Sequence, residues 1–280
     1  MKENIPYYVI NEPYELFYKN DISSYPVGAH THNKAEIYLT LSDLPDALIN
    51  DTVSSIPKNT LIAIPPFCVH QLFHEKDVRY ERYILNLDPV WLEDVLYSKQ
   101  EFTECLKQSS SPLVMTLTKE QVDILTINMQ AVLPVLSQKS LCSTATLLNM
   151  LAILDSIIQD SRYKVTHPTI TITKSQKTVN EIIAFINEHI EDNLSLPDIE
   201  AHFFLNRDYL SRLFAKHTHT SLGRYISIQR IAKAQEYLRE GYTVLQVSEI
   251  LGFSSYAYFF KVFQKMTGIS PSQYRNNFFI

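Results

Sequence analysis

The chain has 280 residues, with 25 Lys and Arg against 30 Asp and Glu, which gives a formal net charge of -5. At roughly 150 residues per domain, this length predicts two domains. A composition of 45% hydrophobic and 20% charged residues excludes a disordered, collagenous or coiled-coil chain. No apolar run approaches the roughly 20 residues that cross a bilayer, and the N-terminal residues lack the features of a signal peptide. We therefore expect a cytoplasmic protein without membrane contact.

The cysteines Cys68, Cys105 and Cys142 are odd in number and lack a CxxC spacing. This pattern disfavours both a disulfide framework and a thiolate zinc site. We expect free, buried thiols, with redox sensing as the alternative.

The first part of the chain, up to about Leu87, has short apolar or alternating runs separated by turn residues. Evenly spaced runs of this kind predict an antiparallel β-sandwich or a small barrel. The expected strands cover residues 15–18, 36–41, 47–49, 60–64 and 79–85.

Helices are expected after this region, over residues 89–96, 119–138 and 144–159. The first begins with a proline and has acidic residues close behind it, as helix N-termini do. In the last one, apolar residues recur every three or four positions and so form a stripe on one face. The stripe consists of Leu147, Leu151, Leu154 and Ile158. It packs either on the sheet domain or against a partner helix in a homodimer, and both alternatives stay open.

Residues 163–177 are rich in Thr and Lys and show no helical period, so we interpret them as a linker. The linker divides the chain into a sheet domain over residues 1–162 and a helical domain over residues 178–280. Helices are expected in the second domain over residues 179–191, 197–203, 207–217, 222–240, 244–251 and 255–266, with a last turn after Pro271.

Charge is distributed unevenly within the helical domain. Residues 178–205 carry six acidic side chains and no Lys or Arg, whereas residues 206–280 carry ten basic and four acidic side chains. A basic segment is typical of nucleic-acid-binding surfaces, but a solvated surface without a partner has the same pattern. A sequence motif is needed to distinguish the two.

The helical domain contains one small unit twice: a short helix, a tight turn and a second helix that begins with a capping residue. The first copy spans residues 197–214 and the second spans residues 247–263. A helix-turn-helix unit places its second helix in the DNA major groove, which requires the tight turn, the cap and an apolar inner face. Gly252 supplies the positive φ that the second turn favours. Residues 222–240, about 28 Å long as a helix, would separate the units by a distance comparable to the roughly 34 Å repeat of DNA.

The helical domain resembles the DNA-binding domain of AraC/XylS-type transcriptional regulators over about a hundred residues. The N-terminal half resembles, more loosely, the cupin-like sensing and dimerisation domain that many members carry. The first unit departs from the family pattern at Glu200, where a small residue is usual, and at His219, where a glycine is usual. The matching positions are Leu194, Ser195, Leu196, Tyr209, Leu210, Ser211, Arg212, Leu213, Phe214, Tyr225, Arg230, Ala234, Leu238, Gly252, Phe253, Tyr258, Phe259, Phe263, Gly268, Ser270, Pro271, Tyr274 and Arg275.

The resemblance implies which side chains face DNA. Arginine can contact guanine through two hydrogen bonds, and an exposed Phe260 can touch a thymine methyl group. Lys216, Arg224, Lys265 and Arg275 are expected to contact phosphates instead. The implied DNA-binding residues are Arg207, Asp208, Ser211, Arg212, Lys216, Ser254, Ser255, Tyr256, Phe260 and Lys261.

The sheet domain contains a second group of candidate residues. His30, His32 and Glu36 are separated by even numbers, so on one continuous strand they share a face, and His70 is expected on a facing strand. The set is similar to the metal-binding motif of enzymatic cupins. We interpret the four residues as the lining of a pocket for a small polar effector, and we assign no metal or cofactor to them. A metal site, and histidines whose hydrogen bonds are satisfied inside the domain, are the alternatives.

The sequence therefore predicts an α+β protein. Its N-terminal domain is expected to be a cupin-like β-barrel with a helical dimerisation segment, and its C-terminal domain to be all-α with two helix-turn-helix motifs. We expect a homodimeric transcriptional regulator rather than an enzyme, an activator that binds promoter DNA, a small-molecule effector such as a sugar, and RNA polymerase. The competing prediction is a metal-dependent cupin enzyme with a helical accessory domain.

Overall fold

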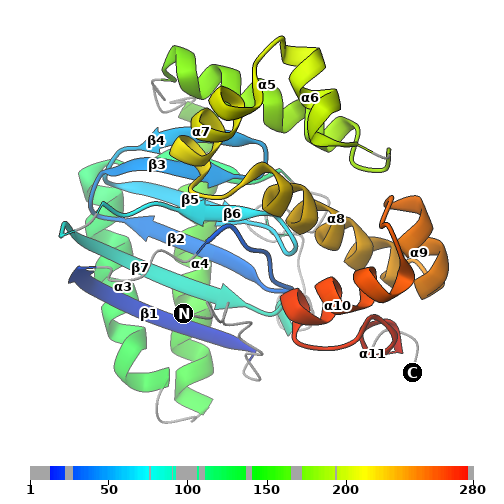
Figure 1. Ribbon diagram of the computed structural model, residues 1–280. Helices are drawn as coiled ribbons and strands as arrows, with labels where there is room; N and C mark the ends of the chain where they lie inside the picture. Colours follow the sequence, from blue (N-terminus) through cyan, green and yellow to red (C-terminus); the bar gives the residue numbers. More distant parts are fainter. Residues whose placement is uncertain are drawn as a thin grey trace.

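The computed structural model describes residues 13–22, 28–75, 77–89, 91–92, 106, 111–136, 141–164, 172–192 and 194–276. The first part of the chain forms β-sheets and the last part forms helices, as Figure 1 shows. Among the described residues, no helix combines the length and the apolar character that a membrane crossing needs.

Five antiparallel strands form the larger sheet, in the order β1-β7-β2-β5-β8. Four of them match expected strands, whereas β8 has no counterpart among the sequence predictions. Their bounds are Tyr14–Ile22 for β1, Arg79–Leu87 for β7, Ala35–Thr40 for β2, Thr60–Ile64 for β5 and Leu113–Thr116 for β8.

Three antiparallel strands form the smaller sheet, in the order β4-β3-β6. Strand β3, Leu44–Ile49, extends the expected strand over residues 47–49, and it pairs with both neighbours. Of its neighbours, β6 at His70–Leu72 is the facing strand that was expected at His70, whereas β4 at Thr52–Ile56 was not predicted. Among the described strands, none belongs to both sheets.

The larger sheet is covered on both faces, which explains why every residue of β2 and β5 is buried. Successive side chains of a strand point to opposite faces. On β2, Ile37 and Leu39 therefore join an apolar cluster with the helices behind the sheet, whereas Tyr38 joins a cluster with the smaller sheet. The two sheets thus pack face to face.

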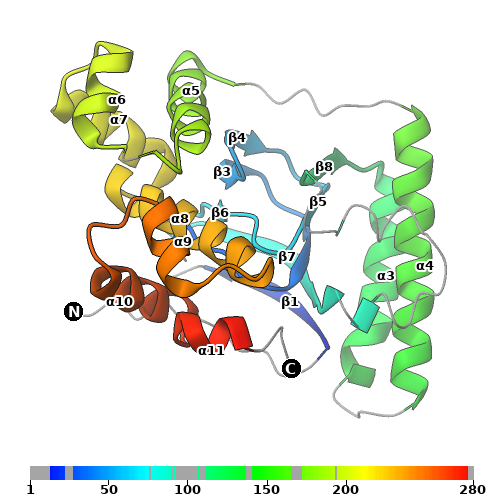
Figure 2. The same ribbon diagram turned by 90° about the vertical axis from the view of Figure 1, so that its right-hand side faces the viewer.

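Helices α3, Lys119–Leu136, and α4, Leu141–Lys164, cover the outer face of the larger sheet. Figure 2 shows this pair on one side of the sheet and the C-terminal helices on the other. The predicted stripe of α4 is completely buried in the cluster that α3 and α4 form with the sheet. Of the two alternatives for this stripe, the structure shows intramolecular packing. Of the expected helix over residues 89–96, Pro89, Trp91 and Leu92 are helical, and the rest lies outside the described residues.

Helices α5 to α11 form the C-terminal part. Helix α5 begins ten residues after the end of α4, at Lys174, and its cap residue is Thr173. The linker predicted over residues 163–177 is therefore too long at both ends, because Thr and Lys at its margins are compatible with helix ends. The bounds are Lys174–Glu188 for α5, Leu196–Phe203 for α6, Arg207–Thr218 for α7, Leu222–Arg239 for α8, Val244–Ile250 for α9, Tyr256–Thr267 for α10 and Pro271–Asn276 for α11.

The helical part docks on the smaller sheet. The side chain of Asn180 on α5 pairs with both backbone groups of Val53, at 2.7 and 3.3 Å, and so extends the sheet edge. Gln176 donates to Asp46 at 2.6 Å. An apolar cluster that contains Leu48 and Val53 of the sheets continues into α5, α6, α7 and α8. The first helix-turn-helix unit therefore shares a core with the sheet domain.

The burial of Leu151 in α4 gives a direct test of the helix–sheet packing. We expect Leu151→Ala to lower the free energy of unfolding by about 2–5 kcal/mol, because it leaves a cavity in the core. The neighbouring Ala152 is exposed, so Ala152→Ser should change it by less than about 0.5 kcal/mol. Denaturation in urea measures both, and equal stability of the two variants would contradict intramolecular packing of the stripe.

Candidate DNA-binding interface and effector site

The two predicted helix-turn-helix units are present, as α6–α7 and α9–α10. Each reading helix begins at a capped N-terminus: Asn206 accepts from the backbone N–H of Tyr209 at 2.9 Å, and Ser255 accepts from that of Tyr258 at 3.2 Å. Both turns contain a residue with positive φ, Phe204 at 54° and Gly252 at 61°. Only the second turn uses the glycine that this conformation favours.

Helix α8 holds the two units apart. It has 18 residues, which corresponds to about 27 Å. Its N-terminal half contributes Leu222 and Tyr225 to the cluster around α7, and its C-terminal half contributes Ile231 and Leu238 to the cluster around α10. Figure 1 shows α7 and α10 at opposite ends of α8. The expected spacer and its apolar contacts with both units are therefore confirmed.

Nine of the ten implied DNA-binding residues are exposed, and Phe260 is partly buried. Exposure is what a DNA contact requires, and the contacts themselves stay predictions. Of the expected phosphate contacts, Lys265 is exposed as well. The exposed residues of the implied set are Arg207, Asp208, Ser211, Arg212, Lys216, Ser254, Ser255, Tyr256 and Lys261.

Two other expected phosphate contacts have partners inside the protein. The guanidinium of Arg275 donates to the carbonyl of Gly241 at 3.3 Å. The guanidinium of Arg224 lies beside Gly28 of the sheet domain. Of the four, Lys216 and Lys265 are the exposed side chains, and their contact with phosphate stays a prediction.

Two exposed tyrosines were left out of the implied set. Tyr209 and Tyr258 are the third residues of their reading helices, and they are 46% and 50% exposed. Their position in both copies is the signal that could have found them, because a tyrosine at the groove-facing start of a helix combines an apolar ring with a hydrogen-bonding group.

The structure shows how the first unit accommodates Glu200 and His219, the two residues that differ from the family pattern. Ala201 is exposed and Glu200 is partly buried, so α6 is not shifted by one residue to bring the alanine inside. The Glu200 carboxylate lies 4.0 Å from Arg207 at the start of the reading helix. His219 has a φ of 47° and ends α7 in the left-handed conformation. Its ring packs against Phe73 at a centroid distance of 4.4 Å and a tilt of 35°, so this helix end contacts the sheet domain.

Arg230, near the middle of α8, connects the two units. Its guanidinium donates to the carbonyl of Asp192 at 3.1 Å, before the first unit, and to the carbonyl of Gly252 at 3.4 Å, in the turn of the second. It also lies over the Phe253 ring, 5.9 Å from the centroid. One side chain therefore links the segment before the first unit with the turn of the second unit across α8.

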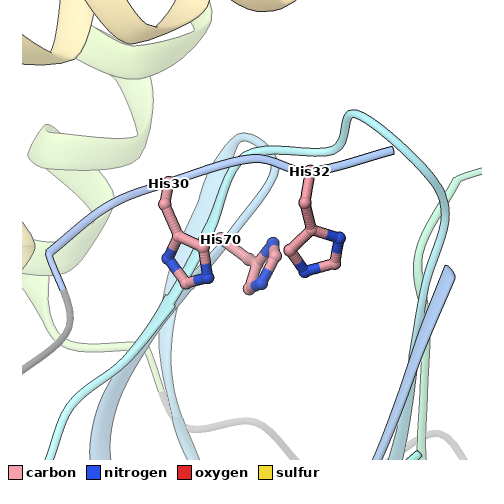
Figure 3. A group of neighbouring side chains, drawn as sticks. All are labelled: His30, His32 and His70. Carbon is pink, nitrogen blue, oxygen red and sulfur yellow. The ribbon is translucent and has the colours of Figure 1, made fainter. Parts of the chain in front are cut away.

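The four candidate effector residues meet where the two sheets meet. His32 Nε2 lies 3.0 Å and His70 Nε2 lies 3.1 Å from Glu36 Oε2. The ring of His30 is 4.3 Å from that of His70, and Figure 3 shows the three imidazoles grouped together. The prediction that His30, His32 and Glu36 share one strand is wrong, because β2 begins at Ala35 and His30 forms only an isolated bridge with His70. The side chains converge nevertheless.

Burial and mutual contact set the charges of this group. Burial alone would raise the pKa of Glu36, but the hydrogen bonds from His32 and His70 lower it well below its usual value. Burial lowers the pKa of His70, and the hydrogen bond and charge of Glu36 more than offset this and raise it. Burial lowers the pKa of His30 to about 3, aided by the neighbouring histidines. Glu36 is therefore anionic and His30 neutral near pH 7.

The thiol of Cys68 is free and partly buried, as expected. Burial raises its pKa to about 12, so the thiol is protonated at neutral pH. Cys105 lies outside the described residues, as does the side chain of Cys142.

Comparison with known proteins agrees with this arrangement. A family model described as "Helix-turn-helix domain" matches residues 199–277. Regulatory protein PocR of Salmonella typhimurium is 32% identical over 130 residues, which are 46% of this chain and 42% of PocR. This chain therefore spans less than half of that relative. The solved structure of ToxT from Vibrio cholerae O395 aligns with 94% of this chain and 97% of ToxT at 14% identity and a TM-score of 0.38.

Regulatory protein SoxS of Escherichia coli is similar along nearly its whole length. It is 32% identical over 102 residues, which are 36% of this chain and 95% of SoxS. The match, the two capped helix-turn-helix units and the shared spacer helix lead to one conclusion: the chain belongs to the AraC/XylS family of transcriptional regulators.

Proposed function

We propose that this protein is a sequence-specific regulator, rather than an enzyme, that binds promoter DNA with both helix-turn-helix units. The observation that carries the proposal is the pair of capped, exposed reading helices at opposite ends of a single buried helix. Their N-termini carry basic and hydrogen-bonding side chains, as a major-groove reader requires. Two units on one rigid spacer then contact one face of a duplex in successive turns.

The sheet domain is proposed to sense a small effector and to pass its presence to the first unit. Support comes from the shared core between the sheets and helices α5 to α8. We propose that the sheet domain and the first unit pack together in two different arrangements. An effector changes DNA binding only if it binds these two arrangements with different affinities. We further propose that the protein activates transcription with RNA polymerase as a partner and that it is located in the cytoplasm.

Binding assays with full-length protein and selected genomic fragments test DNA reading. We expect Arg212→Ala to cost about 1–3 kcal/mol at a cognate site and to relax specificity at one position, because arginine reads guanine through two hydrogen bonds. Lys174→Ala, on the exposed start of α5, is the control and should bind as the parent does. Equal affinity of the parent for cognate and unrelated duplexes would contradict the proposal.

Arg230→Gln tests whether the two units act as one reader. Loss of the link should weaken binding to a site with both half-sites about tenfold or more, because the second contact loses its high effective concentration. Affinity for a site with one half-site scrambled should stay within about twofold of the parent. An equal loss on both sites would instead indicate a general folding defect.

A homodimer is proposed through the outer face of α3, since the stripe of α4 is buried. Ile124 and Ile127 are 46% and 66% exposed there, one helical turn apart. Burial of exposed apolar surface is the main driving force of association. We expect Ile127→Glu to produce monomers in sedimentation velocity and Leu245→Glu, at a 54% exposed position in α9, to remain dimeric. A parent protein that is monomeric at micromolar concentration would refute this interface.

A further inference from the structure

In the sheet domain, ring nitrogens of three histidines lie closer together than the lining of a polar pocket requires. One ring nitrogen of each of His30, His32 and His70 lies within 4.8 Å of the other two. Glu36 comes from the larger sheet and His70 from the smaller one, so the group spans both. Figure 3 shows the three rings next to one another, with His70 between His30 and His32.

The Nδ1 atom of each ring already has a hydrogen-bond partner. His30 Nδ1 lies 2.9 Å from the carbonyl of Gly28, His32 Nδ1 lies 2.9 Å from that of Lys34, and His70 Nδ1 lies 3.0 Å from that of Cys68. A carbonyl oxygen only accepts, so all three Nδ1 atoms donate. In a neutral ring Nε2 then carries the lone pair. Backbone carbonyls orient metal-binding histidines in the same way.

The fourth member adds negative charge to this centre. Glu36 is 8% exposed, and its Oε2 atom lies at hydrogen-bond distance from Nε2 of both His32 and His70. Two nitrogen lone pairs and a carboxylate at this separation repel one another unless a positive charge lies among them. That charge is either a proton on each of the two rings or a bound cation.

We propose that His30, His32 and His70, with Glu36, form a binding site for a divalent transition-metal ion. Imidazole nitrogens favour Zn²⁺ and its neighbours over Mg²⁺ or Ca²⁺. Zn²⁺ binds histidine nitrogen at about 2.0–2.1 Å, which places tetrahedral ligand atoms about 3.3 Å apart. The three nitrogens need to close by only about 1.5 Å to reach this geometry.

The same segments give the ion a route to the helix-turn-helix units. Ala29 and Val69 directly precede His30 and His70, and successive side chains in extended chain point to opposite sides. Both residues are buried in the cluster formed with helices α5 to α8. Drawing the histidines together therefore shifts the surface on which the first unit rests. This effector role rests on the proposed function, whereas the metal site does not.

Metal binding is tested on full-length protein freed of metal with a chelator. We expect one equivalent of Zn²⁺ per chain in equilibrium dialysis with elemental analysis, and a tetrahedral Co²⁺ absorption spectrum when Co²⁺ replaces it. His32→Gln, at a partly exposed ligand, should weaken Zn²⁺ binding by about a hundredfold or more. His189→Gln is the control, because His189 pairs with Asp192 on the surface at 2.7 Å, outside the cluster. Thermal unfolding of each metal-free variant verifies folding.

The outcomes separate the two claims. Failure of the parent protein to bind one equivalent of Zn²⁺ would overturn the metal site. Loss of Zn²⁺ binding in His189→Gln together with retained binding in His32→Gln would overturn it as well. In a second arm, affinity for a cognate duplex is measured with and without Zn²⁺, and a fivefold or larger change is expected in the parent only, within the usual range of coupling between sites. Bound Zn²⁺ with unchanged DNA affinity overturns the effector role. Absence of DNA binding in both states refutes the proposed function instead, while the stoichiometry still decides the metal site.

Discussion

Helix α8 packs against both helix-turn-helix units and completes the core of each. Its two halves lie in different apolar clusters, one shared with α5, α6, α7 and the sheet domain and the other with α9, α10 and α11. Neither unit has a complete core without this helix. A helix of fixed rise then sets the separation of the two reading helices. Arg230 connects this helix to the segment before α6 and to the turn of the second unit.

The sheet domain is attached unequally to the two units. Ala29, Leu48, Val53, Val69 and Phe73 join the core of the first. Among the described residues of the sheet domain, Phe67 alone joins the apolar cluster of the second, with Arg239 over its ring at 3.8 Å. The sheet domain therefore has more apolar contacts with the first unit than with the second. Such asymmetry suits a regulator in which the second unit anchors the protein on DNA and the first responds to the effector.

Much of this structure could be predicted from sequence because it depends on local pattern. The spacing of apolar residues predicted α8 and both helix-turn-helix units. The basic residues counted over residues 206–280 include exposed side chains of the reading helices. Strands β6 and β8 are too short to give a pattern, and their pairing is set by distant partners. The histidine cluster was found through spacing, although the assumed strand was wrong. Its carbonyl contacts, and the bridging role of Arg230, depend on tertiary structure that no spacing reveals.

The central claim is that two rigidly spaced helices read one face of a duplex. Hydroxyl-radical footprinting of full-length protein on a selected cognate site tests it most directly. We expect two protected patches on the same face, one DNA turn or about 10 base pairs apart. A single protected patch, or two patches on opposite faces, would contradict it.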